Sequence, residues 1–225
     1  LIEFDKEWSS LMAKKPEEFE NPNELSEYYV RTAEFPAGFM TQYVPSILIG
    51  DETYQHLAKG FPIGKRFKSA PVVRIADAVP AHLGHHAKAD GRWRIYVFAD
   101  TNADALDSFA NWLDNDRNSP LATYTPSGTD LDSIFDVKVI YQQSHHDVDV
   151  TDIHKVFLPL VGPHQVTDYE KIYAARMDNN IFDARDIDRS GAIVIVRPDQ
   201  YVANVLPLSA KDELAEFFTK NMLPA

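Results

Sequence analysis

The side chains best suited to metal chemistry in this sequence are two groups of histidines. They are His82, His85 and His86 in one stretch, and His145, His146 and the adjacent Asp147 in another. Imidazole nitrogens and a carboxylate could hold zinc or iron if the two stretches met in the fold. The spacing H-x-x-H-H is not that of a helical ligand face, which favours solvent-exposed or packing histidines. We therefore expect no metal site.

A second pattern could serve a flavin. Gly50 and Asp51 follow the apolar run VPSILI and are similar to the Gly-Asp pair that flavoproteins use against the ribityl chain. The following DETYQHLAKG lacks the glycine-rich helix start that would approach a diphosphate, and none of the nine glycines forms a G-x-G-x-x-G or G-x-x-x-x-G-K-[ST] motif. Nucleotide binding by this chain alone is therefore not expected.

Hydrolytic chemistry is no better supported. Ser46 and Ser69 could belong to a Ser-His-Asp site, but no G-x-S-x-G turn presents a serine. The acidic pair Asp183 and Asp186 could do acid-base work, although a solvated turn is the more ordinary interpretation. The sequence thus predicts no catalytic, cofactor-binding or metal-binding residue on this chain.

Composition limits the partners and the compartment. The net charge of −12 would repel nucleic acid and anionic membranes, and the absence of cysteine rules out disulfides and thiol chemistry. No apolar run is long enough to span a membrane and no signal peptide opens the chain. We expect a cytoplasmic protein of the α/β class, with no nucleic acid or membrane partner.

Apolar periodicity places the first elements from about residue 70. APVVRIADAV and RWRIYVFA are predicted strands, joined by a polar loop, and Trp93, Tyr96 and Phe98 are assigned to the core. A helix follows, with Thr101 or Asn102 as its cap and one apolar stripe comprising Leu106, Phe109, Ala110 and Leu113. The strand IFDVKVIYQQ then completes a right-handed βαβ unit with parallel strands.

The C-terminal third is expected to hold two helices and a hairpin. Thr167 and Glu170 form a T-x-x-E capping box that predicts a helix over TDYEKIYAARM, residues 167–177. GAIVIVRPDQYVANVLPL predicts two strands around a Pro198-Asp199 turn, and Ser209 with Asp212 predicts a last helix whose Leu214, Phe217 and Phe218 face inward. This order is that of a thioredoxin-like fold, a mixed sheet flanked by helices. Asp100, Thr101, Asn102 and Ala103 stand where such proteins carry Cys-x-x-Cys.

Residues 1–60 have an uneven pattern that is broken by Pro36 and Pro45, and we interpret them as an irregular arm. Trp8, Phe35, Phe39 and Met40 should then be less buried than Tyr96 and Phe98. The expected domains are therefore 1–60, the end of a preceding domain with its linker, and 61–225, the thioredoxin-like domain.

Two long segments carry a family resemblance. GFPIGKRFKSAPVVRIADAVPAHLGHHAKADGRWRIYVFAD and GAIVIVRPDQYVANVLPL resemble the C-terminal region of the FAD-dependent phenol hydroxylases, the group of phenol 2-monooxygenase and 3-hydroxybenzoate 4-hydroxylase. The intervening DYEKIYAARMDNNIFDARDIDRSG fits the same pattern. Arg197, Pro198 and Asp199 match a motif that is often followed by glycine, whereas Gln200 stands here, so the turn type stays open.

The resemblance implies a C-terminal dimerisation domain of a larger FAD- and NADPH-dependent monooxygenase that hydroxylates phenolic rings. The FAD and substrate domains, with all cofactor-binding and catalytic residues, would then lie upstream, and residues 1–15 would end the last helix of the preceding domain. A homodimer is expected, with the hairpin around Tyr201 and the exposed side of the helix from Tyr169 to Met177 as candidate surfaces. The alternative is an independent thioredoxin-like binding module without redox activity.

Overall fold

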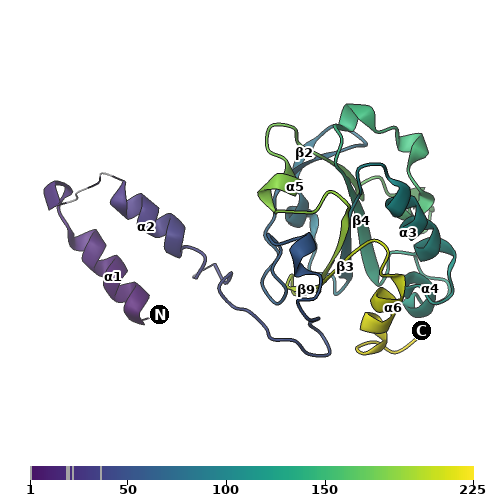
Figure 1. Cartoon of the computed structure of the whole chain (residues 1–225), viewed down its shortest axis with the longest axis horizontal. Helices are drawn as coiled ribbons and strands as arrows, with labels where there is room; N and C mark the ends of the chain where they lie inside the picture. Colours follow the sequence, from purple (N-terminus) through teal and green to yellow (C-terminus); the bar gives the residue numbers. More distant parts are fainter. Residues whose placement is uncertain (1, 19–20, 22, 36) are drawn as a thin grey trace. The chain divides into compact units, whose positions relative to one another are not determined.

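The computed structural model describes residues 2–18, 21, 23–35 and 37–225, and the chain divides into two compact units, Leu1–Gln42 and Tyr43–Ala225 (Figure 1). Residues 43–60 pack within the larger unit, where Leu57 and Ala58 are buried. The expected assignment of 1–60 to a preceding domain stays a prediction. Within the described residues no helix is long and apolar enough to cross a membrane.

The smaller unit contains α1 (Ile2–Ala13), η1 (Pro16–Glu18) and α2 (Glu24–Thr32). The ring of Trp8 stacks on that of Tyr28 at a centroid distance of 6.1 Å, and the Tyr28 hydroxyl donates to a Glu7 carboxylate oxygen at 2.8 Å. Trp8 stays half-buried, while Phe35 and Met40 are exposed. The expectation that these groups are less buried than Tyr96 and Phe98 is therefore confirmed, since both of the latter lie in the core.

The larger unit is built on a seven-stranded sheet in the order β2-β1-β7-β4-β3-β8-β9. Its strands are β1 (Pro71–Arg74), β2 (Pro80–His82), β3 (Trp93–Phe98), β4 (Phe135–Tyr141), β7 (Ile172–Ala175), β8 (Ala192–Val196) and β9 (Val202–Leu206). A separate two-stranded hairpin comprises β5 (Leu160–Val161) and β6 (Val166–Thr167).

The core of this sheet confirms the predicted order. β3 and β4 are parallel and joined through α3 (Asp104–Asn115), with Arg94 opposite Asp136. β8 pairs antiparallel with β3, β9 pairs antiparallel with β8, and α6 (Lys211–Thr219) follows. The sequence β3-α3-β4, then β8-β9-α6, is the thioredoxin-like arrangement, and β7, β1 and β2 extend the sheet beyond β4.

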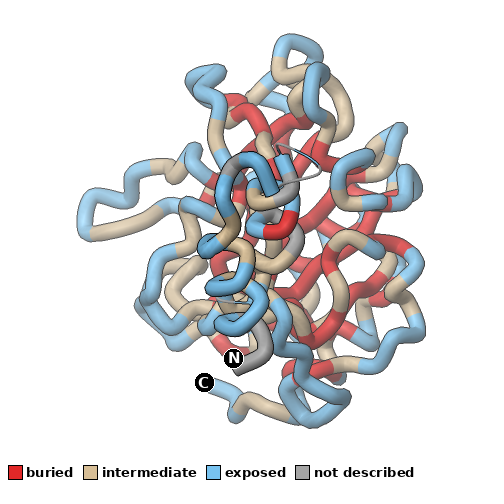
Figure 2. The backbone as a smooth tube through the Cα atoms, turned by 90° about the vertical axis from the view of Figure 1, so that its left-hand side faces the viewer, coloured by how far each residue is buried: buried red, intermediate tan, exposed pale blue. Residues whose placement is uncertain are grey.

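The sheet separates two apolar layers (Figures 1 and 2). On one face α3, α4 (Pro120–Tyr124) and α6 pack against Ile95, Val97 and Val139. On the other face η2 (Gln55–Leu57), α5 (Ile181–Ala184) and the chain around Phe61 and Phe67 cover Tyr96 and Phe98. Because successive strand residues point to opposite faces, β3 contributes to both layers and is buried along its whole length.

The helix predicted over residues 167–177 is wrong. This stretch begins at the end of β6 and continues into β7, whose Ile172 lies opposite Val139 of β4 and whose Ala174 lies opposite Val73 of β1. Pairing with two strands satisfies the backbone on both sides and outweighs the local capping-box pattern. The short helix before β8 is instead α5, where Asn180 Oδ1 accepts from the Phe182 N–H at 2.9 Å.

Helix caps and one loop also differ from expectation. Ala103, with a φ of +63°, precedes α3, and the acceptor is Asp100 rather than Thr101 or Asn102. Ala210 precedes α6 without a side-chain cap, so the Ser209 and Asp212 capping box does not form. The loop expected over 79–91 contains β2 and η3 (Leu83–His86), and η4 (His145–Asp147), η5 (Val150–Asp152) and η6 (Lys155–Phe157) precede β5.

The structure settles the turn between β8 and β9. The Gln200 N–H donates to the Arg197 carbonyl at 2.9 Å, and the Arg197 N–H donates to the Tyr201 carbonyl at 2.8 Å. Gln200 has a φ of +71°. A turn closed in this way, with its last residue left-handed, is a three-residue hairpin loop, and it explains why glycine suits this position.

Candidate functional site

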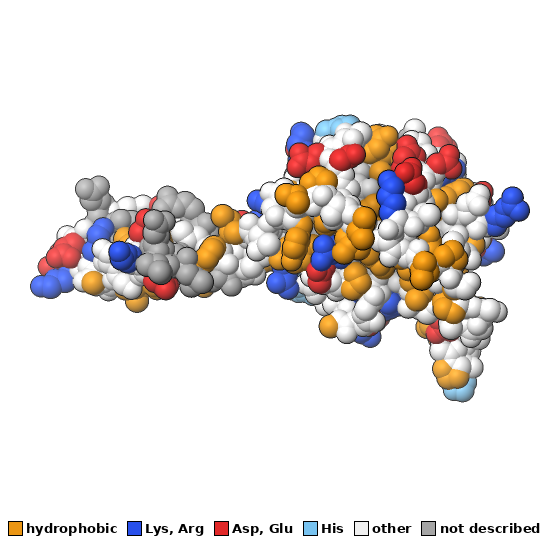
Figure 3. Space-filling model, turned by 90° about the horizontal axis from the view of Figure 1, so that it is seen from below, with side chains coloured by type: hydrophobic (Ala, Val, Ile, Leu, Met, Phe, Trp, Pro, Cys, Tyr) orange, Lys and Arg blue, Asp and Glu red, His pale blue; other side chains and the backbone are white. Residues whose placement is uncertain are grey.

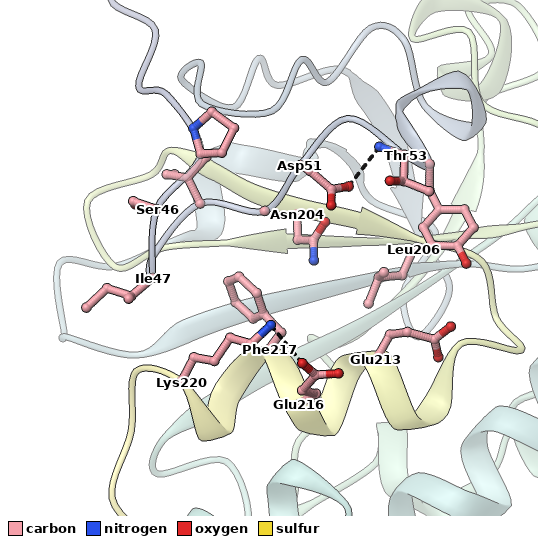
Figure 4. Close-up of a pocket in the computed structure, with 14 residues that line it drawn as sticks. Ser46, Ile47, Asp51, Thr53, Asn204, Leu206, Glu213, Glu216, Phe217 and Lys220 are labelled. Carbon is pink, nitrogen blue, oxygen red and sulfur yellow. Dashed lines mark hydrogen bonds and ion pairs between the residues drawn. The ribbon is translucent and has the colours of Figure 1, made fainter.

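One pocket of about 450 Å³ lies between the loop 45–54, β9 and α6 (Figure 4). Strand β9 contributes Asn204 and Leu206, which are two apart and therefore share a face of the sheet. Helix α6 contributes Glu213, Glu216, Phe217 and Lys220, whose spacing of three and four residues puts them on one side of the helix. The loop closes the third side with Ile47, Asp51 and Thr53.

Gly50 allows this loop to approach the sheet edge. Its N–H donates to the Ala203 carbonyl at 2.7 Å, and a Cβ at this position would lie 2.5 Å from Cγ of Asn204. The Asn204 Oδ1 accepts from the Val205 N–H at 2.9 Å. The close contact of the backbone with β9 therefore explains why glycine occupies position 50 in the Gly50-Asp51 pair.

The pocket is acidic at its mouth. Asp51, Glu213 and Glu216 face one cation, Lys220, which pairs with Glu216 at 2.8 Å. The pKa of Asp51 is lowered by hydrogen bonds from the Thr53 side chain and backbone, so this carboxyl stays ionised. Carboxylates in excess over cations oppose a phosphate or diphosphate, and the pocket does not have the chemistry of a dinucleotide site.

The segment beside the pocket, residues 43–48, contains no charged residue, and we call it the 43–48 surface. Its exposed apolar side chains are Tyr43, Val44, Ile47 and Leu48. The Tyr43 N–H donates to the Gly64 carbonyl at 2.9 Å, and the Asn221 side chain donates to the Ile47 carbonyl at 3.2 Å. These bonds hold the segment against the larger unit.

The predicted association residue Tyr201 lies next to this surface. The rings of Tyr43 and Tyr201 meet edge-on at a centroid distance of 4.8 Å, and the Arg197 guanidinium lies 4.9 Å from the Tyr43 centroid. Tyrosine and arginine together are typical of contact surfaces. The second candidate association surface was the exposed side of a helix from Tyr169 to Met177. Both residues are exposed, but they do not belong to a helix.

A buried charge cluster lies between β3, β4 and the chain just before β7. It comprises Arg94 of β3, Asp136 and Lys138 of β4, Asp132 ahead of β4, and Lys171 ahead of β7. Lys171 Nζ lies 2.8 Å from Asp136 Oδ1 and 2.7 Å from Asp132 Oδ2, and Lys138 pairs with Asp136. Arg94 donates to the Lys88 carbonyl at 2.6 Å and to Asp90 at 2.7 Å, which fastens the loop before β3.

Burial alone would raise the pKa of Asp136, but the ammonium groups of Lys138 and Lys171 outweigh it and hold that pKa well below its usual range. Burial also lowers the pKa of Lys138, and Asp136 only partly offsets this. Arg94, Asp136, Lys138 and Lys171 are each no more than 3% exposed. These groups are shielded from solvent, and their ion pairs link β4 to the chain ahead of β7.

The other candidate residues are dispersed. His82 stacks on His85 at 4.9 Å, His145 contacts His146 at 3.9 Å, and in the described part of the chain no three histidine or acidic side chains are placed to hold a metal. Ser69 accepts from the Gly84 N–H at 3.1 Å. Asp183 pairs with Arg189 and Asp186 with Lys59, so these acids lie in separate surface ion pairs.

Sequence reasoning found Gly50, Asp51 and Ser46 but missed the rest of the pocket. Asn204, Glu213, Glu216 and Lys220 come from β9 and α6, far along the chain. The Glu216-Lys220 spacing of four residues was a visible helix pattern. Nothing in the sequence indicated that the 45–54 loop would lie against that helix.

The strand order and the Asp100–Ala103 position define a thioredoxin-like α/β domain without a redox motif. It is similar to a thiol:disulfide interchange protein from Bacteroides sp., with a TM-score of 0.48 and 12% identity over 72% of this chain and 91% of that one. It is also similar to an exposed lipoprotein thioredoxin from Streptococcus pneumoniae, with a TM-score of 0.34 and 7% identity over 66% and 98% of the two chains.

The chain belongs to the family described as phenol hydroxylase, C-terminal dimerisation domain, which it matches over residues 41–225. It is 43% identical to a 3-hydroxybenzoate 4-monooxygenase from Comamonas testosteroni, over 99% of this chain and 37% of that protein. It is 30% identical to an FAD-dependent monooxygenase from Aspergillus terreus, over 98% and 39% respectively. The chain therefore spans well under half the length of these relatives.

Proposed function

We propose that this chain is the C-terminal structural and dimerisation region of an FAD- and NADPH-dependent monooxygenase that hydroxylates phenols or 3-hydroxybenzoate-type substrates. The observation that carries the proposal is the 43% identity to a 3-hydroxybenzoate 4-monooxygenase over 99% of the chain, together with the match to the dimerisation family. A cytoplasmic location is part of the proposal and rests on the sequence alone.

In this proposal the chain binds no flavin and carries no catalytic residue. The acidic pocket supports this, since Asp51, Glu213 and Glu216 oppose a diphosphate. Flavin and substrate belong to domains of the parent enzyme outside this chain. The 43–48 surface is where such a domain would pack, because it is apolar, uncharged and directly at the start of the larger unit.

Two measurements test the proposal. The reading frame upstream of the Leu1 codon should continue into a G-x-G-x-x-G strand-helix unit, and an immediate stop would contradict a parent enzyme. Sedimentation equilibrium of the chain from about 1 to 100 μM should show dimers. A monomer throughout would show that this region does not associate by itself. Stoichiometric flavin absorbance retained through purification would contradict the absence of a cofactor site.

A further inference from the structure

The hairpin β5–β6 is exposed to an unusual degree for an apolar segment. Leu160 is 50% exposed and Val166 is 61% exposed. Figure 3 shows a narrow projection from the larger unit that carries hydrophobic and histidine side chains. The loop between β5 and β6 has the sequence GPHQ, residues 162–165. The loop is closed by the Gln165 N–H, which donates to the Gly162 carbonyl at 3.1 Å.

This hairpin has apolar groups on both of its faces. Leu160 lies opposite Thr167 and Val161 lies opposite Val166, and neighbouring pairs of a two-stranded ribbon point to opposite sides. Among the described residues no third strand joins it. A two-stranded ribbon is at best marginally stable in water, whereas three or more strands with an apolar face are stable. Both open edges can accept a further strand.

The hairpin is anchored at its base and at the start of its loop. At the base the Asp168 N–H donates to the Pro159 carbonyl at 2.9 Å, and at the first loop residue the Gly162 N–H donates to Asp130 Oδ2 at 2.8 Å. These bonds fix the direction in which the hairpin projects. They also place the exposed loop 126–129 beside it, through Asp130. A fixed apolar projection loses little conformational entropy when it meets a partner.

Charge indicates which partner fits. Residues 156–167, VFLPLVGPHQVT, contain no Asp, Glu, Lys or Arg, although a quarter of the chain is charged. Two copies with a net charge of −12 each repel one another over most of their surfaces. An uncharged projection is the kind of surface through which two such copies can meet without burying like charges.

We propose that the β5–β6 hairpin is the dimerisation arm, and that it packs against the same hairpin of a second copy about a two-fold axis. This rests on the proposed function, which assigns self-association to the chain. Two hairpins joined in this way form a four-stranded ribbon with a shared apolar face, which removes the instability of each alone. A standard interface uses roughly 20–30 residues per side, and loop 126–130 extends the hairpin toward that size.

The first test is L160D/V166D in the full chain, with M12D/L223D as a matched control that adds the same two charges at exposed apolar positions outside every candidate contact surface. Sedimentation equilibrium should show a dimer dissociation constant at least about 100-fold higher for the hairpin variant, because two carboxylates enter the contact, and a wild-type dissociation constant for the control. Circular dichroism confirms that both variants fold.

The outcomes separate the two proposals. A monomeric wild type overturns self-association of this chain, and the arm with it. A dimeric wild type whose hairpin variant dimerises equally well overturns the arm alone. The arm would also be overturned if V44D/I47D were monomeric while L160D/V166D remained dimeric, since the contact would then lie at the 43–48 surface.

A second test does not depend on disrupting the contact. Because the chain contains no cysteine, V166C places one thiol on each copy, and a short bismaleimide can join copies only there. We expect V166C to be cross-linked at least about 10-fold faster than M177C, whose thiol is at the other end of β7. Equal rates for the two variants would overturn the arm.

Discussion

The carboxylate of Asp100 accepts the N–H of Leu106 at 3.0 Å, and its second oxygen accepts the N–H of Ala105 at 3.2 Å. It thereby satisfies two backbone donors of the first turn of α3, at the position where a thioredoxin-like enzyme would carry its first thiol. A negative charge is also favoured at a helix N-terminus. Asp100 therefore stabilises the helix that follows.

We predict that D100A lowers the free energy of unfolding by about 1 kcal/mol, since it removes the only side-chain cap seen at α3 in the described residues. D100N should lose less, because an amide oxygen still accepts. Urea denaturation followed by circular dichroism measures both. N102A, at the exposed neighbouring position, serves as the control and should match wild type.

We predict that A103G stabilises the protein by about 0.5 kcal/mol, because Ala103 has a φ of +63° and glycine adopts this conformation without a Cβ clash. The same substitution two residues later should have the opposite effect on stability. Ala105 lies inside α3, so A105G should lower the free energy of unfolding by about 1 kcal/mol. Thermal and urea unfolding measure both variants. If A103G and A105G both stabilised the protein, or both destabilised it, the explanation from the φ of Ala103 would be wrong.

We predict that D136N destabilises the fold by about 3–5 kcal/mol, because it leaves the buried ammonium groups of Lys138 and Lys171 without their shared carboxylate. The matched control is D178N, which breaks a solvent-exposed pair with Arg176 and should leave the urea midpoint unchanged. A small effect of D136N would show that the cluster is reorganised easily.

The same carboxyl gives a pH dependence. The pKa of Asp136 is lower in the folded chain than in the unfolded chain. The ionised carboxylate therefore contributes fully to the free energy of unfolding at pH values above its pKa in the unfolded chain, which is about 4, and this contribution is lost as the pH falls toward the pKa in the folded chain. Wild-type stability should therefore fall as pH decreases below about 4. D136N should show a shallower decrease in the same urea titrations, and parallel curves would contradict this assignment.

Limited proteolysis should cut first between residues 35 and 43. Met40 and Tyr43 are exposed and suit chymotrypsin, and this stretch joins the two compact units. Mass spectrometry should identify a stable product that contains Tyr96 and extends to the C-terminus. Equally fast cleavage within 61–225 would argue against a self-contained larger unit.

The sequence by itself determined the elements whose patterns are local and strong. Strands β3, β4, β8 and β9 are runs of apolar β-formers, and α3 carries an apolar stripe at helical spacing, so their order predicted the thioredoxin-like core. The two quoted segments also determined the family. In both cases the information lies within contiguous residues.

The tertiary structure decided what depends on distant partners. Ile172 and Tyr173 share a plausible helical face with Tyr169, yet they form β7 because β4 and β1 offer backbone partners on both sides. The pocket needs Gly50 to lie against Asn204, a contact across about two thirds of the chain that no local pattern encodes. Long-range pairing and close backbone contact are properties of the folded chain, so only the structure could place them.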